Sequence, residues 1–287
     1  MVIVNLIGGV GNQMFQYCFG RYLSVLTNQE LFLNINIYSA GNSDRNYDLD
    51  IFRLTKFKDG DAEKALEYLK HSNIPAIHIN ERFFHYNKDL IKSLQCKLIE
   101  SFGNQIPHLI ISGYWQSEKY FRKIEGLIKE DFTFCNPLYG KWELLNKQIV
   151  HSESVMINVR RGDYLQKLDY HGVVDIDYIN SAIELMNERV SNPKFFIFSD
   201  DILWCKNNIP QIENVIFVDE QYYDPKYQYY LQLMKNCKYF IISNSTFAWW
   251  SAWLAPYKNK IVIAPKKWFI SKDLNTKDLF PEKWINI

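Results

Sequence analysis

Apolar and polar positions alternate in a regular order through the second half of the chain. Short apolar runs of strand length are separated by stretches whose apolar residues recur at helical spacing. This pattern predicts strands at 155–159, 195–198, 215–218, 239–242 and 261–264, and helices at 177–190, 227–236 and 247–254. Repeated strand–helix units are typical of a parallel sheet that is covered by helices on both faces. The second half is therefore predicted to be a doubly wound α/β domain.

The first half starts with the same pattern and then becomes less regular. A strand at 2–7 and a glycine-rich turn at 8–13 are followed by a helix that begins at Met14. Further strands are predicted at 31–37, 77–79, 98–102 and 109–111, and helices at 61–70 and 141–150. The polar segment at 151–154 precedes the strand predicted at 155–159. A chain of 287 residues is long enough for two domains. We therefore predict one domain at 1–150 and a second at 151–287.

The composition is that of a globular protein, with 47% hydrophobic and 23% charged residues. A formal net charge of +1 gives no reason to expect a nucleic acid as partner. The five cysteines form no C-x-x-C pair and no cluster with histidine. The pattern therefore predicts neither a disulfide framework nor a zinc site.

The start of the chain lacks the features of a secretory signal, because no basic segment precedes a long apolar run and a small-residue cleavage site. No apolar run reaches the roughly 18 residues of a membrane-spanning helix. We therefore expect a cytoplasmic protein, and we leave open a peripheral association with the inner face of the membrane.

A pair of arginines follows directly on the predicted strand at 155–159. The segment V-R-R-G-D-Y (159–164) places Arg160 and Arg161 where that strand ends. Ligands of open α/β sheets bind beyond the carboxyl ends of the strands, and the planar guanidinium fork can hold two phosphate oxygens at once. The pair is thus a candidate anion site. Such a pair can equally be structural and bind nearby carboxylates at the end of a loop.

Two other strand ends carry polar residues that suit a nucleoside diphosphate. Asn244, Ser245 and Thr246 lie just before or at the start of a predicted helix. Hydroxyl groups and N–H groups at a helix N-terminus attract anions, so this segment and an arginine of a neighbouring strand would hold a diphosphate without a metal. Asp200 would be repelled by phosphate and suits a base with two adjacent donors, such as guanine. Alternatively, Asp200 and Asp201 could bind Mg²⁺.

The glycine-rich turn at 8–13 is not a dinucleotide-binding fingerprint. The third glycine of G-x-G-x-x-G would fall on Met14, and the second predicted strand ends without the carboxylate that would hold a ribose. We interpret the turn as a place where a substrate approaches the backbone closely, near Gly11, with the amides of Asn12 and Gln13 as hydrogen-bonding groups. A plain tight turn is the alternative.

Aromatic residues make up 16% of the chain, and two of them follow the predicted strand at 109–111. Tyr114 and Trp115 at this strand end can stack on the face of a sugar ring, while Gln116 hydrogen-bonds a hydroxyl group. A packed aromatic corner is the alternative that the sequence leaves open.

Four segments resemble, in order, the signature blocks of the α-1,2-fucosyltransferases, glycosyltransferase family 11. They read G-G-V-G-N-Q-M-F-Q-Y (8–17), V-R-R-G-D-Y (159–164), F-S-D-D-I-L-W-C-K (198–206) and S-N-S-T-F-A-W-W-S-A-W-L (243–254). The resemblance implies a GT-B-like fold of two Rossmann-type domains with a donor cleft between them. It assigns the acceptor to the domain at 1–150 and the GDP-sugar to the domain at 151–287. It implies no metal and no other cofactor.

The resemblance also implies roles for single residues. By motif position, Arg160 matches the arginine that grips the donor phosphates, with Arg161 in support, and Ser245 and Thr246 match the hydroxyls of the phosphate site. The other donor-side residues are expected to be Gly11, Asn12, Asp200 and Asn244, and the acceptor-side residues Gln13, Tyr114, Trp115 and His171.

The general base is the least defined part of the implied site. The family's histidine two residues before the first arginine is Asn158 here, an amide that cannot titrate near neutral pH. Asp163 is the nearest motif carboxylate and is expected to be catalytic together with Arg160, with His171 as the second candidate for the base. Asp163 could instead pair with Arg161 as part of the scaffold.

The resemblance implies that the protein is an inverting galactoside α-1,2-fucosyltransferase. It would transfer fucose from GDP-fucose to the 2-hydroxyl group of a galactose-type acceptor. That acceptor would be an oligosaccharide or a lipid-linked glycan of a bacterial surface polysaccharide such as O-antigen. The alternatives are a transferase that uses another GDP-hexose and a non-catalytic module that binds a sugar or a nucleotide. A nucleotide-sugar dehydrogenase is disfavoured because the ribose-binding acid is missing.

Overall fold

The computed structural model describes the whole chain except residues 40–42, 55–56, 59–61, 101–104, 163, 165–171, 210–211 and 272. The chain forms two compact units, the first made of Met1–Cys135 and Leu274–Pro281, the second of Asn136–Asp273 and Glu282–Ile287. The division lies closer to the N-terminus than the predicted boundary at 150. The reason is that helix α6 (Gly140–Val150) packs on strand β6 (Glu153–Val159) and helix α9 (Gln228–Lys235) of the second unit.

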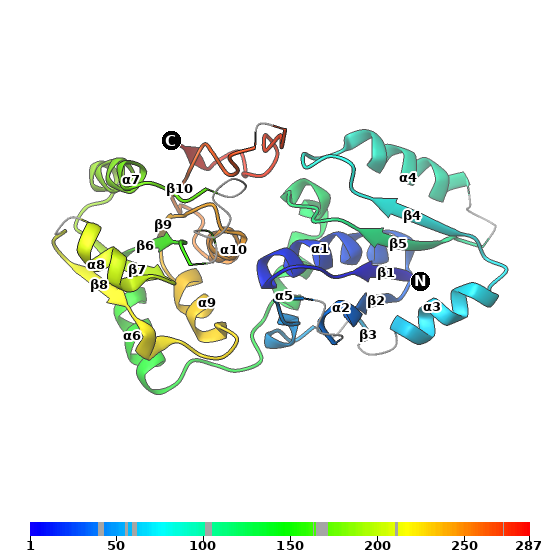
Figure 1. Cartoon of the computed structure of the whole chain (residues 1–287), viewed down its shortest axis with the longest axis horizontal. Coiled ribbons are helices and arrows are strands. Elements are labelled where there is room, and N and C mark those ends of the chain that lie inside the picture. The colour runs from blue at the N-terminus through cyan, green and yellow to red at the C-terminus, as the bar shows by residue number, and fades with distance from the viewer. Residues whose placement is uncertain are drawn as a thin grey trace. The chain divides into compact units, whose positions relative to one another are not determined.

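The first unit is built on a parallel five-stranded sheet with the order β3-β2-β1-β5-β4 (Figure 1). Its strands are β1 (Val2–Asn5), β2 (Leu31–Asn34), β3 (Phe57–Lys58), β4 (Ala76–Asn80) and β5 (His108–Ser112). Its helices are α1 (Val10–Thr27), α2 (Asn36–Ser39), α3 (Ala62–His71), α4 (Lys88–Glu100) and α5 (Glu125–Asp131).

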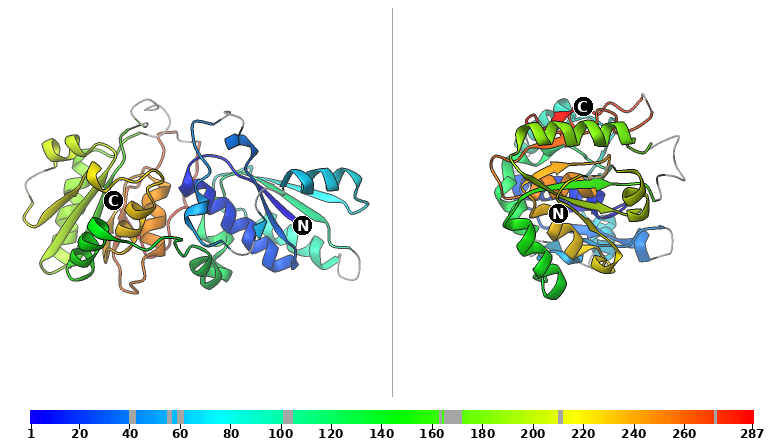
Figure 2. Two further views of the ribbon diagram at one scale, coloured as in Figure 1. Left: turned by 90° about the horizontal axis from the view of Figure 1, so that it is seen from below. Right: turned by 90° about the vertical axis from the view of Figure 1, so that its left-hand side faces the viewer.

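Helices cover both faces of this sheet (Figure 2). Ile3 and Phe32 form a core cluster with Ala65 of α3, whereas Val4 lies against Gly20 of α1. Neighbouring side chains of a strand point to opposite faces, so these contacts place α1 and α3 on opposite sides. The first unit is therefore a layered α/β unit, as the sequence pattern predicts.

Helix α1 lies unusually close to the strand that leads into the glycine turn. It starts at Val10, earlier than predicted, because Gly9 already serves as its N-cap. Gly8 has φ +77°, a left-handed conformation that costs other residues energy. A Cβ atom on Gly20 would lie 2.2 Å from Cγ2 of Val4, so only glycine allows this approach. The N-terminus of α1 is thereby fixed beside the end of β1.

The second unit is built on a parallel six-stranded sheet with the order β11-β10-β9-β6-β7-β8 (Figure 1). Besides β6, its strands are β7 (Pro193–Ser199), β8 (Val215–Val218), β9 (Tyr239–Ile241), β10 (Val262–Ala264) and β11 (Ile285–Asn286). Besides α6 and α9, its helices are α7 (Ile176–Arg189), α8 (Ile202–Asn208) and α10 (Thr246–Leu254).

Both faces of the second sheet are buried under helices. On one face, Ile157 and its neighbours form a core cluster with Ile183 and Met186 of α7. On the other face, the ring of Phe198 meets that of Tyr230 of α9 edge-on, with centroids 4.9 Å apart. The doubly wound α/β fold predicted for this half is confirmed.

The strand predicted at 98–102 is wrong as far as the structure describes these residues, because α4 continues to Glu100. Ile91, Leu94 and Leu98 are buried at the spacing of one helical face. Hydrophobic periodicity also does not reveal α5 and α8, since 7 residues make only about two helical turns.

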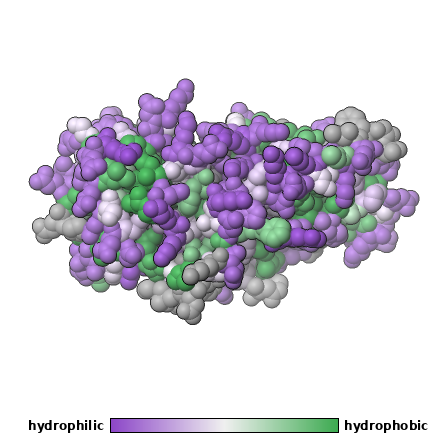
Figure 3. Space-filling view, turned by 90° about the horizontal axis from the view of Figure 1, so that it is seen from above, coloured by the Kyte–Doolittle hydropathy of each residue, from purple (hydrophilic) through white to green (hydrophobic). Residues whose placement is uncertain are grey.

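Hydrophilic side chains predominate on the face shown in Figure 3, with smaller hydrophobic areas between them. Within the described part of the chain, no helix combines the length and the apolar character that a membrane span requires.

Candidate functional site

Three loops of the second unit carry predicted donor-site residues to one edge of the sheet. Strands β9, β6 and β7 are adjacent and parallel, so their carboxyl ends share that edge. Arg160 follows β6, Asp200 follows β7, and Ser243 begins the polar segment after β9. The sheet thus brings together the three strand ends that the sequence pattern singles out.

Arg160 is held by a carboxylate from the neighbouring strand end. Its Nη1 atom lies 3.0 Å from Oδ2 of Asp200, and the two side chains are 30% and 23% exposed. The second oxygen of Asp200 accepts the backbone N–H of Arg161 at 2.9 Å. A guanidinium has five N–H donors, so Arg160 can meet an anion while Asp200 orients it. A guanine-binding role for Asp200 stays a prediction, and guanine would have to share these oxygens with Arg160.

Arg161 points into the protein and supports the loop. Its Nε atom lies 3.3 Å from Oδ2 of Asp201, and its guanidinium carbon lies 4.0 Å from the ring centroid of Trp204. Asp201 also caps α8, because its Oδ1 atom accepts the backbone N–H of Trp204 at 3.1 Å. The two arginines therefore differ in kind. Arg160 faces the strand edge, and Arg161 anchors the loop on α8.

Tyr164 connects the loop after β6 that carries Arg160 and Arg161, called the arginine loop below, to the polar segment after β9. Its hydroxyl donates to the backbone carbonyl of Asn244 at 3.1 Å. The guanidinium carbon of Arg160 lies 5.5 Å from the centroid of the same tyrosine ring, within the range of a cation–π contact. Arg160 and the segment at 243–246 are thus linked by one side chain as well as by adjacent strands.

Asn158 joins all three strand ends below the arginine loop. Its Nδ2 atom donates to the carbonyl of Phe198 at 3.4 Å, and its Oδ1 atom accepts the hydroxyl of Ser243 at 2.5 Å. Asn158 therefore serves as a buried connector of strands, a role that needs no titratable group.

Asn244 is held by the hydrogen bonds of its own side chain. Its amide donates to the carbonyls of Gly172 and Trp268 at 3.2 and 3.1 Å.

Helix α10 presents its N-terminus at this edge. Ser245 is the N-cap and is extended, with φ −122°, and its carbonyl accepts the N–H of Trp249 at 2.9 Å. Within the described part of the chain, the hydroxyl of Ser245 caps none of the helix N–H groups. The first-turn amides, from Thr246 onward, have no acceptor inside the helix. Together with the macrodipole they make this helix end, which lies on the same sheet edge as Arg160, suited to an anion.

Gly162 leaves room for the carboxylate that orients Arg160. A Cβ atom on Gly162 would lie 2.6 Å from Oδ2 of Asp200, the same oxygen that binds Arg160. We therefore expect Gly162→Ala to displace Asp200 and to lower kcat/KM of any reaction at this site about 10–100-fold. Steady-state kinetics would measure the loss.

The matched control is Gly126→Ala on α5, because no described atom lies within 4 Å of the Cβ added there. Gly126→Ala should leave kcat/KM unchanged and stabilise its helix by about 0.5–1 kcal/mol. Equal activity of the two variants would refute the steric role of Gly162.

In the first unit, the glycine turn and the end of β5 meet. Gln116 donates through Nε2 to Oδ1 of Asn12 at 2.9 Å. Gly8 lies under the same asparagine, since a Cβ there would lie 2.7 Å from Nδ2 of Asn12. Gly11 is buried in the first turn of α1, and Asn12 is half-buried. Asn12 is therefore oriented at the carboxyl edge of the first sheet, where ligands of such sheets bind.

Two predicted acceptor residues are placed differently from the prediction. Gln13 is fully buried, and its amide donates to the carbonyls of Gly8 and Asn46 and accepts the N–H of Asp48. Its hydrogen bonds hold the chain around 46–48 and not a substrate.

Trp115 has 0% exposure and packs against Phe19 and Tyr120, with ring centroids 4.5 and 5.3 Å away. It cannot stack on a sugar from this position. It forms the packed aromatic corner, while Tyr114 is 37% exposed.

Glu81 is a candidate residue that sequence reasoning missed. It directly follows β4, and its two oxygens accept the N–H groups of Tyr114 at 2.7 Å and Trp115 at 3.0 Å. These bonds hold Trp115 at φ +57°, a conformation that bulky residues seldom adopt. Burial raises the pKa of Glu81 to about 7, although the two N–H donors act in the opposite direction. A carboxylate just after a strand was the available signal, the same one that identified Asp200.

Glu81 should make the stability of the protein depend on pH. A carboxyl group whose pKa is higher in the folded than in the unfolded chain stabilises the fold below pH 4.5, and this stability is lost as the pH rises through about 7. We expect the Tm of the wild type to fall more steeply between about pH 5 and about pH 8 than that of Glu81→Gln, which stays neutral. Parallel Tm profiles from thermal scans would contradict this assignment.

Asp163 and His171 lie outside the described residues, so their predicted roles receive no structural account. Among the residues that the structure does describe, no group of three or more His, Cys, Asp or Glu side chains could hold a metal ion.

Comparison with known protein families gives a match over the whole chain. The sequence model described as Glycosyl transferase family 11 matches residues 1–287. The "Alpha-1,2-colitosyltransferase" of Escherichia coli is 35% identical over 100% of this chain and 99% of its own length. The "O-antigen biosynthesis glycosyltransferase WbnK" of Escherichia coli is 29% identical over 98% of this chain and 99% of its own length.

Solved structures give the same fold. The NodZ α-1,6-fucosyltransferase of Bradyrhizobium, soaked with GDP-fucose, superposes with a TM-score of 0.52 at 13% identity. The superposition covers 89% of this chain and 92% of that one. At this identity the likeness shows the fold alone. That fold is the GT-B type, which confirms the two α/β units expected from the sequence.

Proposed function

This chain belongs to glycosyl transferase family 11, and we propose that it transfers fucose, or a related deoxy sugar, from a GDP donor to the 2-hydroxyl of a galactose-type acceptor. The colitosyltransferase relative supports an α-1,2 linkage and widens the choice of donor from fucose to colitose. The relative named for O-antigen biosynthesis supports a bacterial surface glycan as the acceptor, free or lipid-linked. The fold likeness to an enzyme soaked with GDP-fucose supports GDP as the nucleotide.

The proposal rests on Arg160, which Asp200 holds at the sheet edge that also carries the N-terminus of α10. When the acceptor hydroxyl attacks C1 of the sugar, the bond from C1 to the diphosphate breaks and negative charge develops on the departing GDP. Arg160 and the first-turn N–H groups of α10, near Ser245 and Thr246, would stabilise that charge. Attack from the side opposite to GDP inverts the anomeric carbon. No metal ion is required in this scheme.

The proton of the attacking hydroxyl would pass to a general base, for which we propose the carboxylate of Asp163, with the imidazole of His171 as the second candidate. The sugar carbon develops oxocarbenium character in such reactions, so a weak base is sufficient. We further propose that the second unit binds GDP and that the first unit holds the acceptor, with Tyr114 among its contacts. We also propose that the reaction takes place in the cytoplasm, at or near the inner face of the membrane.

The direct test is an assay of GDP release and glycan product. The full-length protein would be incubated with GDP-fucose or GDP-colitose and a β-galactoside, and the product linkage determined by NMR. We expect an α-1,2 product with at least one of the two donors. Binding of GDP without any sugar transfer would favour the non-catalytic module instead.

A thermal-shift comparison of GDP, UDP, ADP and NAD tests the nucleotide separately. GDP alone should raise the midpoint of thermal unfolding. The carboxylate of Asp200 suits the two adjacent donors of guanine, and the second strand ends without the carboxylate that would hold the ribose of NAD. A shift with NAD would revive the dehydrogenase alternative.

A further inference from the structure

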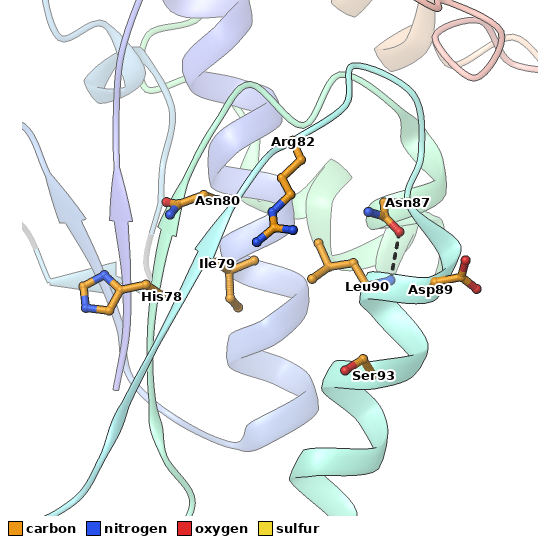
Figure 4. A pocket seen from close by; sticks show the side chains of 8 residues that line it. All are labelled: His78, Ile79, Asn80, Arg82, Asn87, Asp89, Leu90 and Ser93. Carbon is orange, nitrogen blue, oxygen red and sulfur yellow. Dashed lines mark hydrogen bonds between the residues drawn. The ribbon is translucent and has the colours of Figure 1, made fainter.

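The first unit contains a hollow that lies between β4 and α4 (Figure 4). Its volume of about 380 Å³ falls within the roughly 300–1,000 Å³ of small-molecule sites. The residues that line it are His78, Ile79, Asn80, Arg82, Asn87, Asp89, Leu90 and Ser93. None of them is used by the glycine turn, by the arginine loop or by the segment at 243–246.

The hollow has an apolar floor and a polar rim. Ile79 is buried and Leu90 is half-buried, and both point into the space between strand and helix (Figure 4). The side chain of Arg82 reaches into the same space from the loop after β4, and Ser93 faces it from α4. Asn87 is fixed at the rim because its Oδ1 atom accepts the N–H of Leu90 at 2.9 Å.

The outer edge of β4 adds backbone groups to this rim. Among the described strands, β4 pairs only with β5. The N–H of Glu81 and the carbonyl of Pro75 bond to β5. Because alternate residues of a paired strand bond to the same side, the backbone groups of His78 and Asn80 point outward, to the edge beside the hollow. These two residues therefore line the hollow even though Figure 4 shows their side chains on the other side of the strand.

This chemistry fits an uncharged, polyhydroxylated ligand. The lining offers one guanidinium and one carboxylate, so it carries no excess charge for a phosphate or a nucleic acid. It combines donors and acceptors around a small apolar surface. A sugar ring presents the complement, hydroxyl groups on its edge and C–H groups on its face. An extended peptide would form backbone hydrogen bonds with the outer edge of β4. That pairing would not involve the guanidinium of Arg82 or the hydroxyl of Ser93.

We propose that this hollow is an acceptor subsite that binds a sugar ring of the glycan beyond the reacting galactose. The inference rests on the proposed function and extends it, because it identifies the part of the first unit that binds the acceptor beyond its reacting galactose. The chain supports this placement. Glu81, the residue after β4, holds the backbone of Tyr114 and Trp115, and the next residue, Gln116, bonds to Asn12. The subsite and the glycine turn are thus joined through one loop.

The test compares two acceptors of different length, methyl β-galactoside and lacto-N-tetraose, with the donor that the assay above identifies. Arg82→Ala removes the guanidinium, and Ser93→Phe fills the hollow. Each variant should raise the KM for lacto-N-tetraose about five- to tenfold, as expected for one or two lost hydrogen bonds. The KM for methyl β-galactoside and the KM for the donor should not change. Arg189→Ala, on the exposed end of α7, is the matched control and should change none of these values.

Two results would overturn the subsite. One is an equal rise in KM for both acceptors, and the other is no rise for either. Failure of the proposed function looks different, because the wild type would then transfer sugar to neither compound. In that case saturation-transfer NMR with lacto-N-tetraose reads the subsite without turnover. A signal that Ser93→Phe abolishes supports the subsite, and absence of a signal with the wild type refutes it.

Discussion

Replacing Arg160 by alanine is expected to lower kcat for sugar transfer about 10²–10³-fold, the usual loss when one charge-stabilising donor is removed from a transition state. Arg160 is partly exposed at the strand edge that also carries the N-terminus of α10, and its cation would face the diphosphate as charge develops there. Steady-state kinetics with GDP-sugar and β-galactoside measures the loss. The fold should survive, because Arg161, Asn158 and Tyr164 still hold the three strand ends together.

Two companion variants separate the catalytic from the structural role of Arg160. Arg160→Lys keeps the charge but loses the planar fork, so its activity should lie between those of the wild type and the alanine variant. Asp200→Asn keeps the arginine and removes its carboxylate partner, and should cost less than Arg160→Ala. If Asp200→Asn were as inactive as Arg160→Ala, Asp200 would have a role of its own beyond orienting Arg160, such as the predicted contact with guanine. Near-normal turnover of Arg160→Ala would refute the assignment of this site.

Replacing Asp131 by alanine is expected to lower the free energy of unfolding by about 3–5 kcal/mol, the range for breaking a buried ion pair from one side. Oδ2 of Asp131 accepts the hydroxyl of Tyr17 at 2.8 Å and Nε of Arg21 at 2.9 Å. The side chains of Arg21 and Asp131 are only 10% and 7% exposed, so the variant would leave a guanidinium buried without its carboxylate. Both partners lie on α1, whose N-terminus forms the glycine turn.

Denaturant unfolding measures this loss, and helix α5 supplies its own control. Glu125 and Lys129 form an exposed ion pair on the same helix, with N···O 2.6 Å. Glu125→Ala should change stability by less than about 1 kcal/mol, because exposed pairs contribute little. The double variant Arg21→Met with Asp131→Leu should recover part of the loss, since it removes both charges. A cost for Asp131→Ala no greater than that for Glu125→Ala would contradict the buried-pair account.

Sequence reasoning succeeded where the signal was local. Strand and helix periods are set by residues a few positions apart, so the alternation of the second half, the start of α10 at its Ser/Thr cluster and the strand ends were all accessible. The main error in secondary structure also had a local cause. A strand was predicted at 98–102 where α4 continues to Glu100, because a few consecutive apolar residues fit a buried strand as well as the inner face of a helix.

The candidate site was predicted in part. Residue type and position after a strand correctly brought Arg160, Asp200 and the segment at 243–246 to one edge. The same rule placed Trp115 and Gln13 at an edge without indicating that both side chains turn inward. Glu81 was not predicted, because an isolated carboxylate after a short strand is no specific signal. Its role follows only from its contacts with the N–H groups of Tyr114 and Trp115.

The sequence by itself determined the α/β alternation, the family and the set of polar residues that end each strand, since all of these depend on order along the chain. Only the tertiary structure decided which of those residues meet. Asp200 binds Arg160, Tyr164 reaches Asn244, and Glu81 holds the turn at 113–116. The reason is that these contacts depend on strand order in the sheet and on burial, and neither is written in the spacing of residues along the chain.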